Sequence, residues 1–233
     1  MSINSACQDL SLSNRMLANE GVMDAFGHVS MRHPDDPGKF LLSRSLPPSL
    51  VQPEDILCFD LDSRPEQPTE LPLYAERVIH GEIYKERPDV TAVCHYHAAA
   101  VLAFCLSGRK LVPVSQMGAV LGKDVPLWDS QEDFGDTDLL VVKPEEGRSL
   151  AKRLGPHWTV LMSRHGATTV GTTLREMTFR AINTVGNAQS QLLALSLGHC
   201  DQLTQGEIER AGVMKPMAIE RAWQYWVSRL PST

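Results

Sequence analysis

The stretch Cys94-His95-Tyr96-His97 most constrains the fold, because it lies between two apolar segments, Val90–Val93 and Ala98–Leu106. This order is typical of a buried strand that runs directly into a helix. Side chains alternate along a strand, so residues i and i+2 lie on the same face, about 7 Å apart. His95 and His97 can therefore approach one metal ion. A single histidine beside an apolar strand is more often a hydrogen-bonded core residue, but a His-x-His pair at the end of a strand favours the metal interpretation.

Length and charge narrow the class of protein. A chain of 233 residues can form one large α/β domain, and no linker marks a second domain within residues 1–233. The formal net charge is −6 and the basic residues are scattered, which argues against nucleic acid as a partner. No apolar run approaches the ~18 residues of a membrane span, so we expect a cytoplasmic protein without a membrane partner. The five cysteines lack CxxC spacing, which fits reduced thiols in the cytoplasm.

Apolar periodicity and punctuation by glycine and proline predict the remaining elements. Thr173-x-x-Glu176 is a capping-box signature that begins a long helix. The aromatic C-terminal helix favours packing or subunit contact. Expected helices cover 6–20, 73–86, 98–106, 144–154, 174–198 and 216–230. Expected strands cover 27–32, 40–45, 55–62, 90–97, 139–142 and 158–166.

One carboxylate shares the apolar face of the predicted helix 73–86. Glu76, Ile79, His80 and Ile83 are spaced i, i+3, i+4 and i+7, so they lie on one side of that helix. A glutamate on a buried face must be paired, protonated or bound to a cation. The alternative is a carboxylate that reaches water at the end of the helix. We expect His80 to be a hydrogen-bonding neighbour of Glu76 rather than a metal ligand.

A third histidine ends the predicted strand 158–166. His165 follows an apolar run and precedes Gly166, so its place resembles that of His97 at the end of the earlier strand. Three histidines from two strand ends, with the inward Glu76, make a plausible site of three nitrogens and one oxygen. This ligand set suits zinc, and manganese, cobalt or iron can occupy it as well.

Four motifs, taken together, resemble the class II aldolase/adducin family over about residues 14–197. The motifs are Gly27-His28-Val29-Ser30, Glu76 ahead of Ile83-Tyr84 and Arg87-Pro88-Asp89-Val90, His95-Tyr96-His97, and Arg164-His165-Gly166. The resemblance implies a three-layer α/β/α sandwich with a central mixed β-sheet, and a homotetramer with active sites near subunit interfaces. It also implies one divalent metal ion per subunit on His95, His97 and His165, with Glu76 leaving the metal to act as acid or base.

The departures from the family pattern concern the substrate. Sugar-phosphate aldolases of the family carry an asparagine after the first glycine and two serines before the glutamate, which help to bind phosphate. Here these positions are His28 and Tyr74-Ala75. Ser43-Arg44-Ser45 replaces a threonine-glycine or serine-glycine pair, and Arg44 adds a fork-shaped cation suited to a carboxylate. The aldolase tyrosine that handles the leaving group has no clear match in the stretch 127–130.

These departures resemble a branch of the family that decarboxylates hydroxylated aromatic acids. The resemblance implies a carboxy-lyase that uses Mn²⁺ or Zn²⁺ to chelate a phenolate and its neighbouring carboxylate. The expected substrate is a hydroxylated aromatic dicarboxylate, best matched by 3-hydroxy-2-methylpyridine-4,5-dicarboxylate from vitamin B6 degradation. Arg44, with Ser43 or Ser45, would hold the second carboxylate, and Glu76 or a water it controls would protonate the ring carbon. His28 is expected either to contact the substrate or to support its own turn.

Two alternatives remain open at this point. The first is a class II aldolase or epimerase that acts on a small sugar phosphate with the same metal and the same Glu76. Release of carbon dioxide or of an aldehyde distinguishes these reactions. The second is a non-catalytic interaction protein like the adducin head, against which the three histidines and the glutamate argue. A protein that binds no transition metal would favour that second alternative.

Overall fold

The computed structural model describes residues 2–231, and its centre is a seven-stranded sheet in the order β3-β2-β1-β4-β7-β6-β5. Neighbouring strands are antiparallel except β5 and β6, which are parallel, so the sheet is mixed. In chain order the strands are β1 His28–Arg32, β2 Lys39–Ser43, β3 Ile56–Asp60, β4 Ala92–Tyr96, β5 Leu127–Trp128, β6 Thr159–Met162 and β7 Gly166–Gly171.

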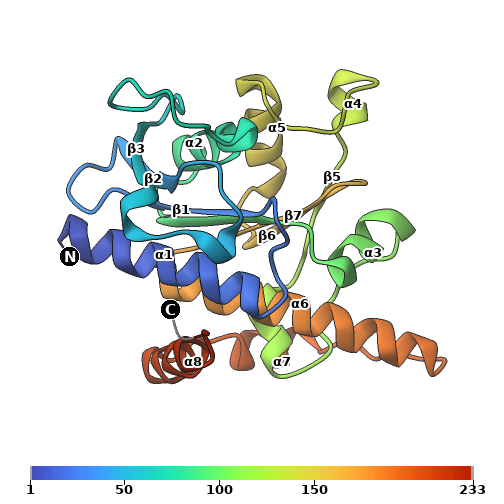
Figure 1. Ribbon diagram of the computed structural model, residues 1–233. Coiled ribbons are helices and arrows are strands. Elements are labelled where there is room, and N and C mark those ends of the chain that lie inside the picture. The colour runs from blue at the N-terminus through green and yellow to red at the C-terminus, as the bar shows by residue number, and fades with distance from the viewer. Residues whose placement is uncertain (1, 232–233) are drawn as a thin grey trace.

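Helices cover both faces of the sheet, as Figure 1 shows. One face is covered by α2 (Val78–Glu86) and α5 (Pro144–Leu154), which pack against each other. The other face is covered by α1, α3 and α6, and α8 packs on α1 and α6 from outside. The other elements are α1 Ile3–Asn19, α3 Ala99–Ser107, α4 Ser130–Phe134, α6 Leu174–Ser196, α7 Gln205–Ala211, α8 Pro216–Ser228, and short 3-10 turns η1 Pro48–Leu50, η2 Pro53–Asp55, η3 Ala75–Arg77 and η4 Met117–Leu121. The expected three-layer α/β/α fold is therefore confirmed.

Strand β4 separates two hydrophobic cores. Cys94 and Tyr96 lie in the core shared with α1, α3 and α6, whereas Val93 lies in the core shared with α2 and α5. This alternation is the period of two expected for a strand buried on both faces. His95 is fully buried and shares the face of Val93. The expectation that Cys94 and His95 point to opposite faces is confirmed.

The predicted strand 158–166 is wrong in its extent. The chain leaves β6 at Met162, turns through Ser163 to His165, and returns antiparallel as β7, which the sequence analysis missed. Arg164 has φ +61°, a left-handed conformation that reverses the chain at this point. The threonines and glycines of β7 gave too little apolar signal to indicate a strand.

Two further expectations are corrected. The helix predicted for 73–86 begins only at Val78, because Glu76 has non-helical dihedrals (φ −86°, ψ 16°) in the preceding turn η3. The strand predicted for 139–142 is absent from the described residues, since Leu139 has φ +70° and the Val141 amide donates to Glu76 instead of to a strand. The helices at the N-terminus, after Lys143 and after Thr173 lie close to their expected positions.

No helix within residues 2–231 combines the length and the apolar character that a membrane span requires.

Candidate metal centre

The structure brings Glu76, His95, His97 and His165 together at one end of the sheet. One ligand atom from each residue lies within 4.8 Å of the others. The Nε2 atoms of His95 and His97 are 3.0 Å apart, and Oε2 of Glu76 lies 3.6 Å from Nε2 of both His95 and His165. Two nitrogens on a tetrahedral zinc ion, each bonded at 2.0–2.1 Å, would be about 3.3 Å apart. The cluster therefore has the size of a single coordination sphere.

Thr168 on the neighbouring strand orients His95. The two residues are paired in the β4–β7 register, and His95 Nδ1 lies 3.3 Å from Thr168 Oγ1. The Thr168 hydroxyl donates its own proton to the sulfur of Met162, so it accepts from His95. The proton of a neutral His95 is then on Nδ1, which leaves the lone pair of Nε2 directed at the cluster.

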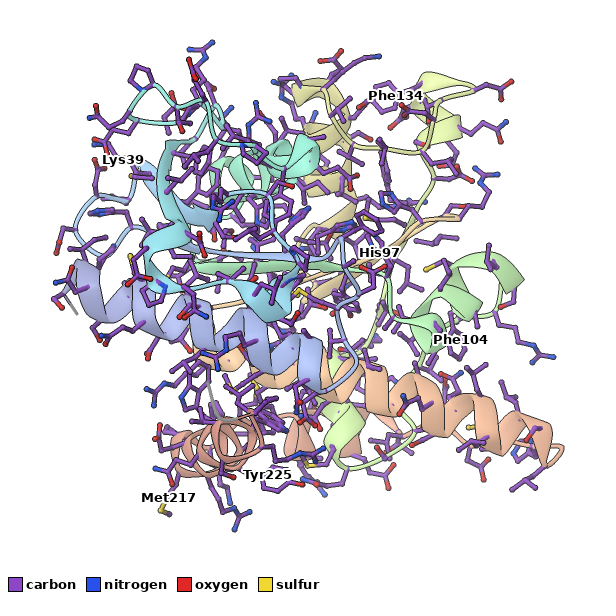
Figure 2. The ribbon with its side chains drawn as sticks, in the orientation of Figure 1. Lys39, His97, Phe104, Phe134, Met217 and Tyr225 are labelled. Carbon is purple, nitrogen blue, oxygen red and sulfur yellow. The ribbon has the colours of Figure 1, made fainter. Side chains whose placement is uncertain are left out.

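Asp24 orients His97 in the same way. His97 Nδ1 lies 3.2 Å from Asp24 Oδ1, which also accepts from the backbone amides of Phe26 and Gly27. A carboxylate only accepts, so His97 also carries its proton on Nδ1 and presents an Nε2 lone pair to the cluster. Figure 2 shows His97 where β4 ends and the chain continues toward α3.

His165 reaches the cluster from the turn between β6 and β7. The left-handed Arg164, whose guanidinium pairs with Asp129, makes this turn. Gly166 allows β7 to pass close to β4, because a Cβ there would lie 2.4 Å from the Tyr96 carbonyl oxygen and 2.9 Å from Cδ2 of His97. The close approach of β7 to β4 at Gly166 fixes how near His165 lies to the rings of His95 and His97.

Glu76 enters from the other side, on the turn η3. Its Oε1 accepts from the Val141 amide at 2.8 Å, and its Oε2 faces His95 and His165. The non-helical backbone of Glu76 displaces it from the helix that carries Ile79 and Ile83. The carboxylate thus has one oxygen held by the backbone and one available for chemistry.

The donor set fits a divalent cation. Burial, with the nearby rings of His165, His28 and His97, holds the pKa of His95 well below its ordinary value, so this ring is neutral. Two Nε2 lone pairs facing each other at 3.0 Å repel unless a proton or a cation lies between them. Neutral imidazoles with outer partners that fix their tautomers are the usual ligands of zinc and related metals.

A cavity of about 350 Å³ opens beside the cluster. Phe26, Tyr74, Ala75 and Leu140 form its apolar part. Its polar side chains are His28, Ser45, Glu76, His97 and His165. Apolar walls around a few polar groups suit a flat ring with polar substituents. The described lining contains no lysine or arginine, so an anion inside must be held by neutral donors or a metal ion.

The substrate residues expected from sequence separate into two groups. His28 and Ser45 line the cavity, whereas Ser43 and Arg44 do not. Ser43 is fully buried and its hydroxyl donates to Tyr74, and Nε of Arg44 pairs with Asp55 at 2.8 Å. The expected contact between His80 and Glu76 is wrong, because the two ring nitrogens of His80 bond to His28 and Ser30.

Sequence reasoning missed several residues of the site. Asp24 and Thr168 orient the histidines, and Phe26 and Leu140 line the cavity. Asp24 lies three residues before the glycine of the first motif, which was its only local signal. Thr168 becomes visible only when β7 is recognised, since the contact depends on the strand register.

One family model and three known proteins are similar to this chain over most of its length. The model of the family "Class II Aldolase and Adducin N-terminal domain" matches residues 8–192. Decarboxylase tropJ of Talaromyces stipitatus is 32% identical over 236 residues, covering 91% of this chain and 89% of that protein. The 3,4-dihydroxyphthalate decarboxylase of Arthrobacter keyseri is 28% identical over 212 residues, covering 83% of this chain and 80% of that protein. L-fuculose 1-phosphate aldolase from Glaciozyma antarctica superposes with a TM-score of 0.81 at 23% identity, covering 97% of this chain and 88% of that chain.

Proposed function

Because the chain belongs to the Class II Aldolase and Adducin family, we propose that it is a metal-dependent decarboxylase of hydroxylated aromatic acids. The observation that carries the proposal is the four-residue cluster beside a largely apolar cavity. Two relatives that match most of this chain are named as decarboxylases, one of them of a dihydroxyphthalate. The substrate we propose first is a hydroxylated aromatic dicarboxylate such as 3-hydroxy-2-methylpyridine-4,5-dicarboxylate.

His95, His97 and His165 would hold one divalent ion, Mn²⁺ or Zn²⁺. Such an ion would supply Lewis-acid stabilisation of the negative charge left on the substrate as carbon dioxide departs. Asp24 and Thr168 support this role by keeping the Nδ1 protons of His97 and His95 away from the cluster. The walls formed by Phe26, Tyr74 and Leu140 would hold the ring and exclude water.

Glu76 would move the proton. Decarboxylation replaces the bond from the ring carbon to the carboxylate by a bond to hydrogen, so one proton must reach that carbon. With Oε1 of Glu76 held by the Val141 amide, Oε2 is the oxygen that would deliver this proton, directly or through water. Ser45 and His28 are the neutral hydrogen-bonding groups available to the substrate's carboxylates inside the cavity.

Arg44 remains a proposed contact for a second carboxylate at the edge of the site. Its Nε is engaged by Asp55, while its two terminal nitrogens have no hydrogen-bond partner among residues 2–231. A substrate that extends beyond the cavity could use these nitrogens. If Arg44→Gln leaves KM for dicarboxylates unchanged, this contact does not form.

The assay compares two products from one enzyme sample. Protein supplied with Zn²⁺ or Mn²⁺ is incubated with hydroxylated pyridine and benzene dicarboxylates, and in parallel with L-fuculose 1-phosphate. We expect carbon dioxide from at least one aromatic acid and no aldehyde from the sugar phosphate. Aldehyde release without carbon dioxide would favour the aldolase alternative instead.

We also propose a homotetramer with active sites near subunit interfaces. Three large apolar side chains support an assembly: Leu106 on α3 is 62% exposed, and Leu193 and Leu197 at the end of α6 are 68% and 89% exposed. Helices α3 and α6 pack against each other, and large apolar side chains that they leave exposed are candidates for subunit contacts. Light scattering coupled to size-exclusion chromatography measures the mass, and a monomer at micromolar concentration would contradict the proposal.

A further inference from the structure

A buried chain of hydrogen bonds leads away from the cavity. His28 Nδ1 lies 2.7 Å from His80 Nε2, and His80 Nδ1 lies 2.6 Å from Ser30 Oγ. Ser30 Oγ in turn lies 2.7 Å from the hydroxyl of Tyr84. None of the four side chains is more than 1% exposed, so water cannot substitute for any of these contacts. These hydrogen bonds alternate between β1, which carries His28 and Ser30, and α2, which carries His80 and Tyr84.

The phenol at the inner end sets the direction of every proton in the chain. Among the described residues the Tyr84 hydroxyl has one hydrogen-bond partner, Ser30, so it must donate to Ser30 to satisfy its own proton. Ser30 then donates to Nδ1 of His80, whose proton is therefore on Nε2 and points to His28. The opposite direction would leave the buried Tyr84 proton without an acceptor.

This direction determines what His28 presents to the cavity. Its Nδ1 accepts from His80, so a neutral His28 carries its proton on Nε2. Nε2 has no protein partner among the described residues, and it is not among the three fully buried side-chain atoms that lack one. The ring lines the cavity, 5.1 Å from the ring of His95 and 4.7 Å from that of Tyr74. The free N–H therefore faces the space beside the metal cluster.

We propose that this chain keeps His28 as a hydrogen-bond donor to a carboxylate oxygen of the substrate. The inference rests on the proposed function and assigns His28 the anion-binding role that no cation in the cavity lining fulfils. His80, Ser30 and Tyr84 are positioning residues, because they contact no substrate and act by fixing the tautomer of His28. A fixed donor favours a carboxylate over a neutral hydroxyl at the same place, because a hydrogen bond to an ionised oxygen is stronger.

The tautomer can be measured without any substrate. Protein with ¹⁵N-labelled histidine, supplied with diamagnetic Zn²⁺, is studied by NMR, and the His28 signals are assigned from their loss in His28→Gln. We expect the His28 proton on Nε2 in the wild-type protein and a mixture of both tautomers in Ser30→Ala. Ser13→Ala is the matched control, since Ser13 is equally buried and bonds to Thr178 outside this chain. A proton on Nδ1 of wild-type His28 would overturn the inference.

The kinetic test asks whether the donor binds the acid. His28→Leu removes the N–H, and the loss of a hydrogen bond to a charged oxygen should raise KM about tenfold with little change in kcat. In Ser30→Ala only the molecules with the His28 proton on Nε2 can donate to the substrate. An equal mixture of the two tautomers should therefore raise KM about twofold. Ser13→Ala should leave KM unchanged.

The two proposals fail separately. If no acid is decarboxylated, the proposed function fails. The NMR measurement of the His28 tautomer without substrate still tests whether the hydrogen bonds from Tyr84 to His28 fix that tautomer. If carbon dioxide is released but KM is the same in His28→Leu as in the wild type, only the donor role is overturned.

Discussion

The Nε2 atoms of His95 and His97 lie 3.0 Å apart while Thr168 and Asp24 accept the protons of the two Nδ1 atoms. With this arrangement of protons both facing nitrogens direct lone pairs at one point, where a proton or a cation can bridge them. A divalent ion bound at this point should stabilise the folded protein.

Adding Zn²⁺ to metal-free protein should raise its melting temperature. At a free concentration of 100 times Kd the gain is about 2.7 kcal/mol, which corresponds to roughly 5–10 °C for a chain of this length. Differential scanning calorimetry measures the shift. His165→Ala should abolish most of it, whereas His199→Ala, at a side chain that is 79% exposed, should keep it. An equal shift in both variants would contradict binding at the cluster.

Asp24→Asn should weaken metal binding about 10- to 100-fold, because the amide holds the His97 tautomer less firmly than a carboxylate does. Competition with a chromophoric chelator gives the affinity. Asp35→Asn is the control, because the Asp35 side chain has no hydrogen bond or ion pair within residues 2–231 and only its backbone amide donates, to His33. Unchanged affinity in Asp24→Asn would show that His97 needs no outer partner.

Glu76→Gln should lower kcat for carbon dioxide release by about 10²- to 10⁴-fold, since the amide cannot deliver a proton. Metal content should persist, because the three histidines remain. Glu82→Gln is a matched control: Glu82 is also buried, but it pairs with Lys85 and Arg148 away from the cavity. It should lose stability and keep kcat. Full turnover by the Glu76 variant would remove Glu76 from the reaction.

Gly166→Ala should impair the site more than the fold. The new methyl group would lie 2.4 Å from the Tyr96 carbonyl oxygen and 2.9 Å from the His97 ring, which forces β7 and His165 outward. We expect about 1–3 kcal/mol of destabilisation and a clear loss of metal affinity. Gly186→Ala, where nothing lies within 4 Å in the middle of α6, should instead gain up to about 1 kcal/mol.

Acid should destabilise the metal-free protein through His80. Burial lowers the pKa of His80 from 6.5 to about 3, so between these values the unfolded chain takes up a proton that the folded protein does not. The free energy of unfolding should therefore fall as the pH decreases below 6.5, by up to about 1.4 kcal/mol per pH unit from this group. Urea unfolding between pH 7 and pH 4 measures the slope. His80→Gln should reduce it, and His199→Gln should not.

The sequence predicted which four side chains gather in the cluster, but not the residues that orient them. His95 and His97 could be predicted because a strand has a strict period of two, and Glu76 and His165 because their motifs accompany that pair. The partners Asp24 and Thr168 could not, since each contact joins segments about 73 residues apart and depends on register. His80 was assigned the wrong partner because the helix that carries it begins after Glu76, which changes its direction.

Among the secondary-structure elements, too, some could be predicted from the sequence and others could not. Long periodic helices such as α5 and α6 were found near their true limits, because packing on one face imposes a clear repeat. Strand β7 was missed because five of its six buried residues are threonine, glycine or alanine, which carry little hydropathy signal, and Val170 is its one large apolar residue. The reversal at Arg164 is a left-handed non-glycine residue, a conformation that no local pattern indicated.

The alternation along β4 makes the site an all-or-none outcome of strand pairing. If β4 slipped by one residue against β1 and β7, His95 would point into the hydrophobic core under α1 and α6. A slip in one direction would put Cys94 in its place beside Glu76. Such a misfolded form would keep the same count of strands and helices, so a spectrum of secondary structure would not reveal it. Loss of bound metal would be its first visible sign, which makes metal uptake a practical report on correct folding for every variant described above.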